Sequence, residues 1–105
     1  MTRDKSPRAI AVRAVAQKSL EAYAAKILDP DTVLGAVTKA AADGFFCLRV
    51  APDVACDLRG TKAAAVIAEL LKREGFEHQW EGRISMRKEN PSGCEVMVFD
   101  LLVSW

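Results

Sequence analysis

The chain has few of the residues that carry enzymatic chemistry. It contains one histidine, His78, and three cysteines, Cys47, Cys56 and Cys94, with no Cys-x-x-Cys pair. An odd number of widely spaced cysteines predicts neither a disulfide framework nor a zinc site. The glycines stand singly, without a Gly-x-Gly-x-x-Gly or Gly-Lys-Ser/Thr motif. We therefore expect no nucleotide cofactor.

Long apolar runs are also missing. No run approaches the roughly 18 to 20 residues needed to cross a bilayer, and residues 1–8 lack the apolar segment of a secretory signal. We expect a cytoplasmic protein that does not insert into a membrane. At 105 residues, half of them hydrophobic and 28% charged, the chain has the length and composition of one globular domain.

The single histidine makes catalysis simple to assess, because His78 is the only imidazole base available to a nucleophile. It falls in an alternating segment, which favours a packed histidine. A thiol enzyme built on Cys56 and His78 is the least favoured hypothesis. Asp53 and Asp57 lack the ligand pattern of a calcium loop. The sequence predicts no catalytic residue, no metal site and no cofactor.

Helical spacing and capping residues predict three helices. The first runs from Pro7 to about Leu28, with Ser6 as its N-cap and a narrow, alanine-rich apolar stripe. The second runs from about Thr32 to Asp43 after an aspartate cap, and the third follows Thr61 and ends at Glu74. Gly44 and Gly75 supply the positive φ that ends a helix. On the third helix we expect Ala64, Val66, Ile67, Leu70 and Leu71 to face the core.

Alternating apolar residues predict four strands. They span 45–50, 76–80, 83–87 and 95–105, with a tight turn at Glu81-Gly82 and a hairpin over 89–93. Phe46 is expected to face the core with Leu48 and Val50. The last strand is apolar on both faces. We therefore expect it to be central in the sheet, or to have one face covered by helices and the other by a partner.

The expected architecture is α+β, in the order helix-helix-strand-helix-strand-strand-strand. A small, mainly antiparallel sheet carries helices packed on one face and a long N-terminal helix. Up to Leu28 the chain has six basic and two acidic residues, whereas the remainder has nine basic and twelve acidic residues. We therefore divide the chain into a basic N-terminal segment and helical arm, 1–28, and a compact α+β domain, 29–105.

One resemblance bears on function. A helix ending in Ala41-Ala42-Asp43-Gly44, the strand 45–50, a helix ending in Leu71-Lys72-Arg73-Glu74-Gly75-Phe76, and the terminal strand Leu101-Leu102-Val103-Ser104-Trp105 follow one another. Over residues 32–105 this order resembles small structural proteins of tailed bacteriophages. The resemblance implies a virion or assembly role. His78 and the long first helix depart from the pattern.

The favoured hypothesis is a non-enzymatic structural or interaction protein, a minor phage virion component such as a capsid decoration, cement or neck protein. It would act through protein–protein contacts as a homo-oligomer, in the host cytoplasm and in the virion, with copies of itself or other virion proteins as partners. We predict that the partner-binding residues are Arg8, Val12, Arg13, Leu20, Tyr23, Val96, Val98, Leu102 and Trp105.

The alternative is a small nucleic-acid-binding or regulatory protein that uses the basic N-terminal helix, with Arg3, Lys5, Arg8 and Arg13. It is not favoured, because the basic residues are scattered and no aromatic residues are interleaved with them.

Overall fold

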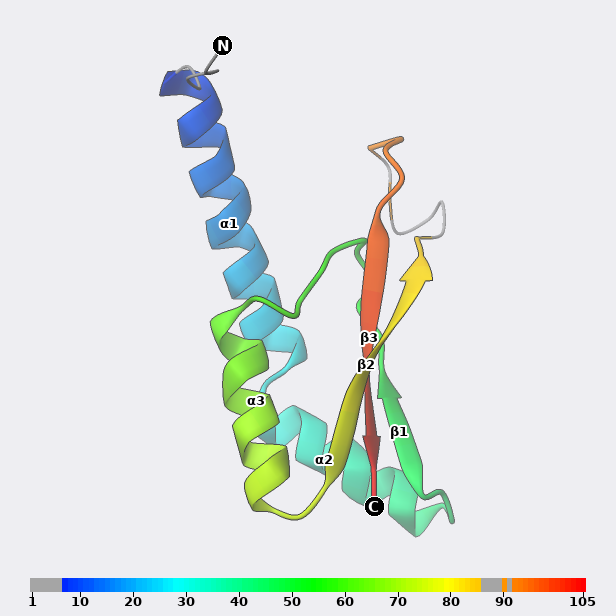
Figure 1. Ribbon diagram of the computed structural model, residues 1–105. Helices are drawn as coiled ribbons and strands as arrows, with labels where there is room; N and C mark the ends of the chain where they lie inside the picture. The colour runs from blue at the N-terminus through cyan, green and yellow to red at the C-terminus, as the bar shows by residue number, and fades with distance from the viewer. Residues whose placement is uncertain (1–6, 86–89, 91) are drawn as a thin grey trace.

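The computed structural model describes residues 7–85, 90 and 92–105, and it is a mixed α+β fold (Figure 1). Three helices and three strands follow in the order α1 (Pro7–Ile27), α2 (Pro30–Ala42), β1 (Cys47–Val50), α3 (Lys62–Arg73), β2 (Glu77–Ile84) and β3 (Met97–Ser104). The predicted α+β class is confirmed. The predicted N-cap Ser6 and the strand residues 86 and 87 lie outside the described residues.

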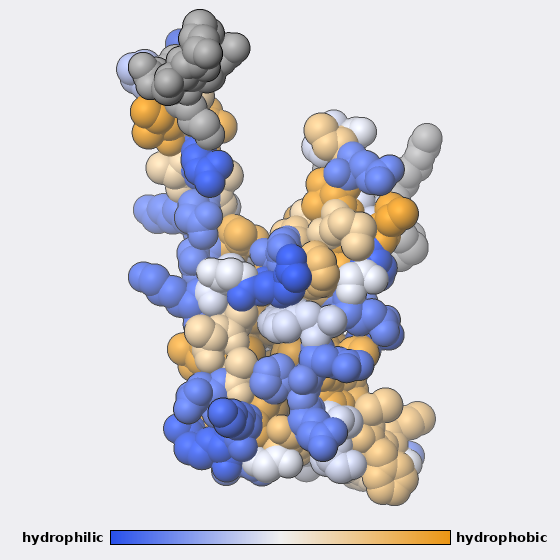
Figure 2. Space-filling view, in the orientation of Figure 1, coloured by the Kyte–Doolittle hydropathy of each residue, from blue (hydrophilic) through white to orange (hydrophobic). Residues whose placement is uncertain are grey.

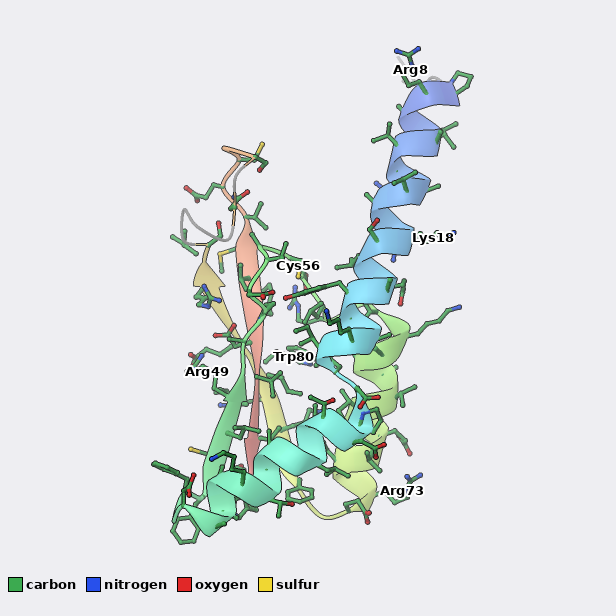
Figure 3. The ribbon with its side chains drawn as sticks, turned by 180° about the vertical axis from the view of Figure 1, so that it is seen from behind. Arg8, Lys18, Arg49, Cys56, Arg73 and Trp80 are labelled. Atoms are coloured by element: carbon green, nitrogen blue, oxygen red, sulfur yellow. The ribbon has the colours of Figure 1, made fainter. Side chains whose placement is uncertain are left out.

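The sheet is antiparallel throughout, and β3 lies between β1 and β2. This confirms the central place predicted for the last strand. Its residues alternate between two environments. Leu101 and Val103 face the helices and are fully buried with Leu28, Ile67 and other side chains of the core. Figure 3 shows the same division on the outer strands, because Trp80 points toward the helices and Arg49 points away from them.

The number of strands differs from the prediction, because the chain does not turn at Glu81-Gly82. Instead β2 runs straight through both residues, and Gly82 pairs with Phe99 of β3. A Cβ built on Gly82 would stand 2.9 Å from a carbon of the Phe99 ring. The glycine therefore allows the close approach of an aromatic ring within the sheet.

Helix capping follows the sequence closely. The Asp29 side chain accepts a hydrogen bond from the Thr32 amide at 3.0 Å, so α2 begins at Pro30, two residues before the predicted start. Thr61 caps α3 as predicted, through a 3.1 Å bond from the Ala64 amide to its hydroxyl. One prediction on α3 is wrong: Val66 is exposed, since the buried face is formed by Ala64, Ile67 and Leu71.

Helix α1 divides into two parts. Near its end, Ala24 is fully buried in the core, as is Leu28 just beyond it, and Leu20, Tyr23 and Ile27 pack against that core. Every residue from 7 to 19 is exposed. We call residues 7–19 the free arm; it projects from the body in Figures 1 and 2. The last two turns of α1 thus pack with the compact body, whereas the sequence places the boundary of the arm at Leu28.

Two glycines offer a matched test of this packing. Gly82→Ala would push the Phe99 ring away, so we expect it to lower the free energy of unfolding by about 1–3 kcal/mol. Gly35→Ala, within α2, meets nothing within 4 Å. It should raise the free energy of unfolding by about 0.5–1 kcal/mol, because alanine favours helix. Urea unfolding measures both; a Gly82→Ala variant as stable as the parent chain would contradict the close approach.

Candidate interaction surfaces

Three aromatic residues have exposed side chains where α2 and β3 end and β1 begins. Phe46 is 75% exposed, Phe45 61% and Trp105 37%. The Trp105 amide donates to the Phe46 carbonyl at 3.2 Å, and the Trp105 ring meets half-buried Phe76 edge-on, with centroids 6.3 Å apart. We call Phe45, Phe46 and Trp105 the aromatic end. Figure 2 shows hydrophobic side chains gathered at the lower right of the molecule, whereas the lower left is hydrophilic.

Helices α2 and α3 are both terminated by a glycine that is followed by a phenylalanine, Phe45 after α2 and Phe76 after α3. At Gly44, with φ of +90°, the glycine amide donates to Ala41 and the Phe45 amide to Ala40, which is a Schellman motif. The same pair of bonds ends α3, from Gly75 to Lys72 and from Phe76 to Leu71. A Schellman motif usually brings the residue after the glycine against the residue that accepts its bond.

The two motifs differ in the residue whose carbonyl accepts the bond from the phenylalanine amide, which is Leu71 in α3 and Ala40 in α2. Leu71 is large and fully buried, and Phe76 packs against the core to which Leu71 belongs. Ala40 offers only a methyl group, so Phe45 gains little cover and stays exposed. The prediction that Phe46 faces the core is wrong, because the sheet begins one residue later, at Cys47. Sequence alternation alone could not reveal where the sheet ends.

The sheet face away from the helices carries a closed cluster of charges. Asp100 is buried at 1% exposure and accepts from Arg49 Nη1 at 2.8 Å and from Arg83 Nε at 3.0 Å. Arg49 Nη2 also meets Glu81 at 2.7 Å. Glu81 and, second, Asp100 raise the pKa of the Arg49 guanidinium above its ordinary value. The cluster ties both outer strands to β3 and satisfies the buried carboxylate.

A shallow hollow lies beside this cluster, toward the aromatic end. It encloses about 420 Å³ and is lined by residues of all three strands, including Cys47, Gln79, Leu102 and Ser104. His78 also lines it and is half-buried opposite Val103. No group of three or more histidine, cysteine, aspartate or glutamate side chains within the described part of the chain could hold a metal ion.

The loop after β1 holds the other residues considered for chemistry. The Asp57 carboxylate accepts hydrogen bonds from the backbone amide and the guanidinium of Arg59, at donor–acceptor distances of 2.9 to 3.0 Å. This pairing lowers the pKa of the Asp57 carboxyl. The Arg59 guanidinium also stacks over the Phe99 ring at 3.5 Å. Cys56 packs against the core in the same loop. Asp57 is thus engaged with Arg59, in a contact that orders the loop.

A second loop contact anchors α1. The Tyr23 hydroxyl donates to the Asp53 carboxylate and accepts from the Asp53 amide at 2.8 Å. Above it, the Glu21 carboxylate accepts from the Lys62 amide at 3.0 Å, at the start of α3. A carboxylate at a helix N-terminus is favourable electrostatically. Sequence spacing placed Tyr23 on an apolar stripe but could not show its hydroxyl's partner.

The predicted partner-binding residues fall into three groups. Arg8, Val12 and Arg13 are exposed on the free arm, whereas Leu20 and Tyr23 are half-buried against the core. Of the predicted residues on the last strand, Trp105 is exposed, Val96 and Leu102 are half-buried, and Val98 is fully buried.

The prediction that Val98 lies on an exposed surface is therefore wrong, because its side chain is fully buried. Arg83 stands opposite Val98, and its guanidinium ends on Asp100, so its aliphatic stem crosses this part of the face.

Comparisons with known proteins add no relative: no family model, curated protein or solved structure matches this chain. Among the residues that the structure describes, no helix has both the length and the apolar character needed to cross a membrane.

Tyr23 allows a test of the α1 anchor, because it is the only tyrosine. Burial and the hydrogen bond to Asp53 raise the pKa of Tyr23 from 10.0 to about 12. Since the folded chain holds this proton more tightly than the unfolded chain, the contribution of Tyr23 to stability is complete below pH 10 and is lost as the pH rises toward 12.

Ultraviolet absorbance of the tyrosinate follows this titration. We expect a midpoint well above 10.0 in the folded chain, near 10.0 in urea, and lowered by Asp53→Ala. A folded chain that titrates at the ordinary value would show that the anchor does not form.

Proposed function

We propose that this chain is a non-enzymatic structural or interaction protein that binds a partner protein through the aromatic end. The observation that supports this most directly is the exposure of adjacent Phe45 and Phe46 beside Trp105. Aromatic residues are enriched in the cores of protein interfaces, where a few residues, often tryptophan, tyrosine or arginine, carry most of the binding energy. Two phenylalanines in water at a helix end contribute little to folding, so contact with a partner is the better use of them.

The aromatic end is also fixed before any partner arrives. The Schellman motif after α2 sets the backbone at Phe45, and the bond from Trp105 to Phe46 ties the end of β3 to the start of β1. Binding then costs little backbone entropy. A preformed, apolar and aromatic patch suits a lasting contact within an assembly.

The partner class comes from the resemblance of residues 32–105 to phage structural proteins. On that basis the partner is another virion protein or a further copy of this chain. The role is that of a capsid decoration, cement or neck protein, present in the host cytoplasm and in the virion.

One observation favours nucleic acid as a second candidate partner. Every charged residue of the free arm is basic, namely Arg8, Arg13 and Lys18. These residues are five apart, so each lies about 140° around the helix from the last, and no face collects them for a phosphate backbone. Steeply salt-dependent binding of DNA in a gel-shift titration would favour this alternative instead.

A photo-crosslinking experiment in the producing cells tests the aromatic end. A benzophenone-bearing phenylalanine replaces Phe46 in one variant and Val54 in its control, because Val54 is an exposed apolar residue in the loop after β1. We expect position 46 to form one specific protein adduct that position 54 does not form. Adding Phe45→Ser should weaken the contact by about 10- to 100-fold and so remove the adduct.

The outcome that contradicts the proposal is equally defined. If positions 46 and 54 give the same adducts, or if the adduct survives Phe45→Ser, the aromatic end is not the binding surface. Both residues are exposed, so a loss of folding would not explain either result.

A further inference from the structure

The free arm carries an exposed stripe of one basic and two apolar residues, of which Val15 is turned away from the core. Arg8, Val12 and Val15 recur at spacings of four and three residues, so they share one side of the helix. Val15 lies nine residues before buried Ala24, which places it about 180° around the helix. Val15 is 65% exposed and Val12 is exposed similarly. This outer stripe has no contribution to make to the core.

A groove of about 600 Å³ runs along the flank of α3. It is lined by Pro30, Ala65, Val66, Glu69, Leu70 and Arg73, and most of its surface is apolar. Val66 is 57% exposed there. The groove and the outer stripe are both apolar surfaces that the core leaves uncovered. In Figure 3, Arg8 marks the far end of the free arm and Arg73 the lower end of α3.

The bond from the Lys62 amide to Glu21 sets the two surfaces at known heights. It puts the start of α3 level with Glu21 of α1, and the two helices run in the same direction (Figure 1). At about 1.5 Å per residue, Val15 lies roughly 9 Å above this level and Val66 roughly 6 Å below it. Val12 lies roughly 14 Å above and Leu70 roughly 12 Å below. The valines of the outer stripe therefore lie about as far above the Glu21–Lys62 contact as Val66 and Leu70 lie below it.

We propose that the free arm of one copy lies in the α3 groove of a second copy, in a two-fold symmetric dimer. A two-fold axis perpendicular to the helices, near the level of Glu21, turns each arm antiparallel to the partner's α3. Val15 then meets Val66 of the partner subunit, and Val12 meets Leu70 of the partner subunit. Both contacts form twice, as a closed symmetric interface requires.

Charge favours the groove over direct pairing of two arms. The charged residues of the arm are all basic, so two arms side by side would repel. The groove is lined by Glu69 and Arg73, and its Pro30 stands between Asp29 and Asp31 in the sequence. The arm thus brings positive charge to a surface with an excess of carboxylates.

Covering the arm also accounts for its helical structure. A helix of this length with an exposed surface on all sides is marginal in water, and its alanines bury little area each. In the dimer its stripe is covered. This interface is separate from the aromatic end and does not depend on the function proposed for it.

The mass of the full chain in solution, measured by sedimentation over a range of concentrations, tests the dimer. We expect the parent chain to show twice the chain mass. Val15→Glu and Val66→Glu should each raise the dissociation constant by at least about 100-fold, because each buries two unpaired charges. The double variant Val15→Lys with Val66→Glu should restore the dimer, since the two charges then meet across the interface.

Two controls keep the test specific. Ile10→Glu changes an equally exposed residue on another side of the arm and should leave the dimer intact. Phe46→Ser alters only the aromatic end and should leave the contact between the arm and the groove intact, so failure of that proposal is distinguished from failure of this one. Unfolding in urea confirms that each variant is folded. A monomeric parent chain, or a dimer that survives both Val15→Glu and Val66→Glu, would overturn the proposal.

Discussion

The anchoring of the last turns of α1 determines what the rest of the helix can do. Ala24 and Leu28 are fully buried, Tyr23 is bonded to Asp53, and Glu21 accepts from the Lys62 amide. An alanine-rich helix of this length is marginal by itself, so the exposed turns continue a helix that is already held at one end. The same contacts fix the height and direction of the free arm relative to α3, and hence where it reaches on a neighbouring molecule.

A second constraint comes from a sheet that helices cover on one face. The central strand β3 must bury both faces. On the face toward the helices, its residues Leu101 and Val103 belong to the hydrophobic core. On the opposite face, Asp100 is buried by two arginines, one from each outer strand. Breaking a buried ion pair by removing one partner leaves an uncompensated charge, so the three strands are coupled through this carboxylate. The charges are used to hold the sheet together.

Sequence reasoning succeeded where the signal is local and failed where it depends on a neighbour distant in the chain. The aspartate and threonine caps, the glycine stops at Gly44 and Gly75 and the central place of β3 were predictable, since each depends on a few adjacent residues. Gly82 was mistaken for a turn residue because only Phe99, across the sheet, shows why it is glycine. The aromatic end was missed apart from Trp105, because the exposure of Phe45 follows from the small size of Ala40.

These features describe a small body that presents an exposed aromatic patch at one end and a helical arm toward the other. Repeated copies joined through the arm would each leave the aromatic end free for a further partner, which is the arrangement an assembly protein needs. Hydrogen exchange of the amides of residues 7–19 tests this account most directly. We predict exchange that slows strongly as protein concentration rises, because dimerisation covers the arm. Rapid exchange that is the same at every concentration would contradict it.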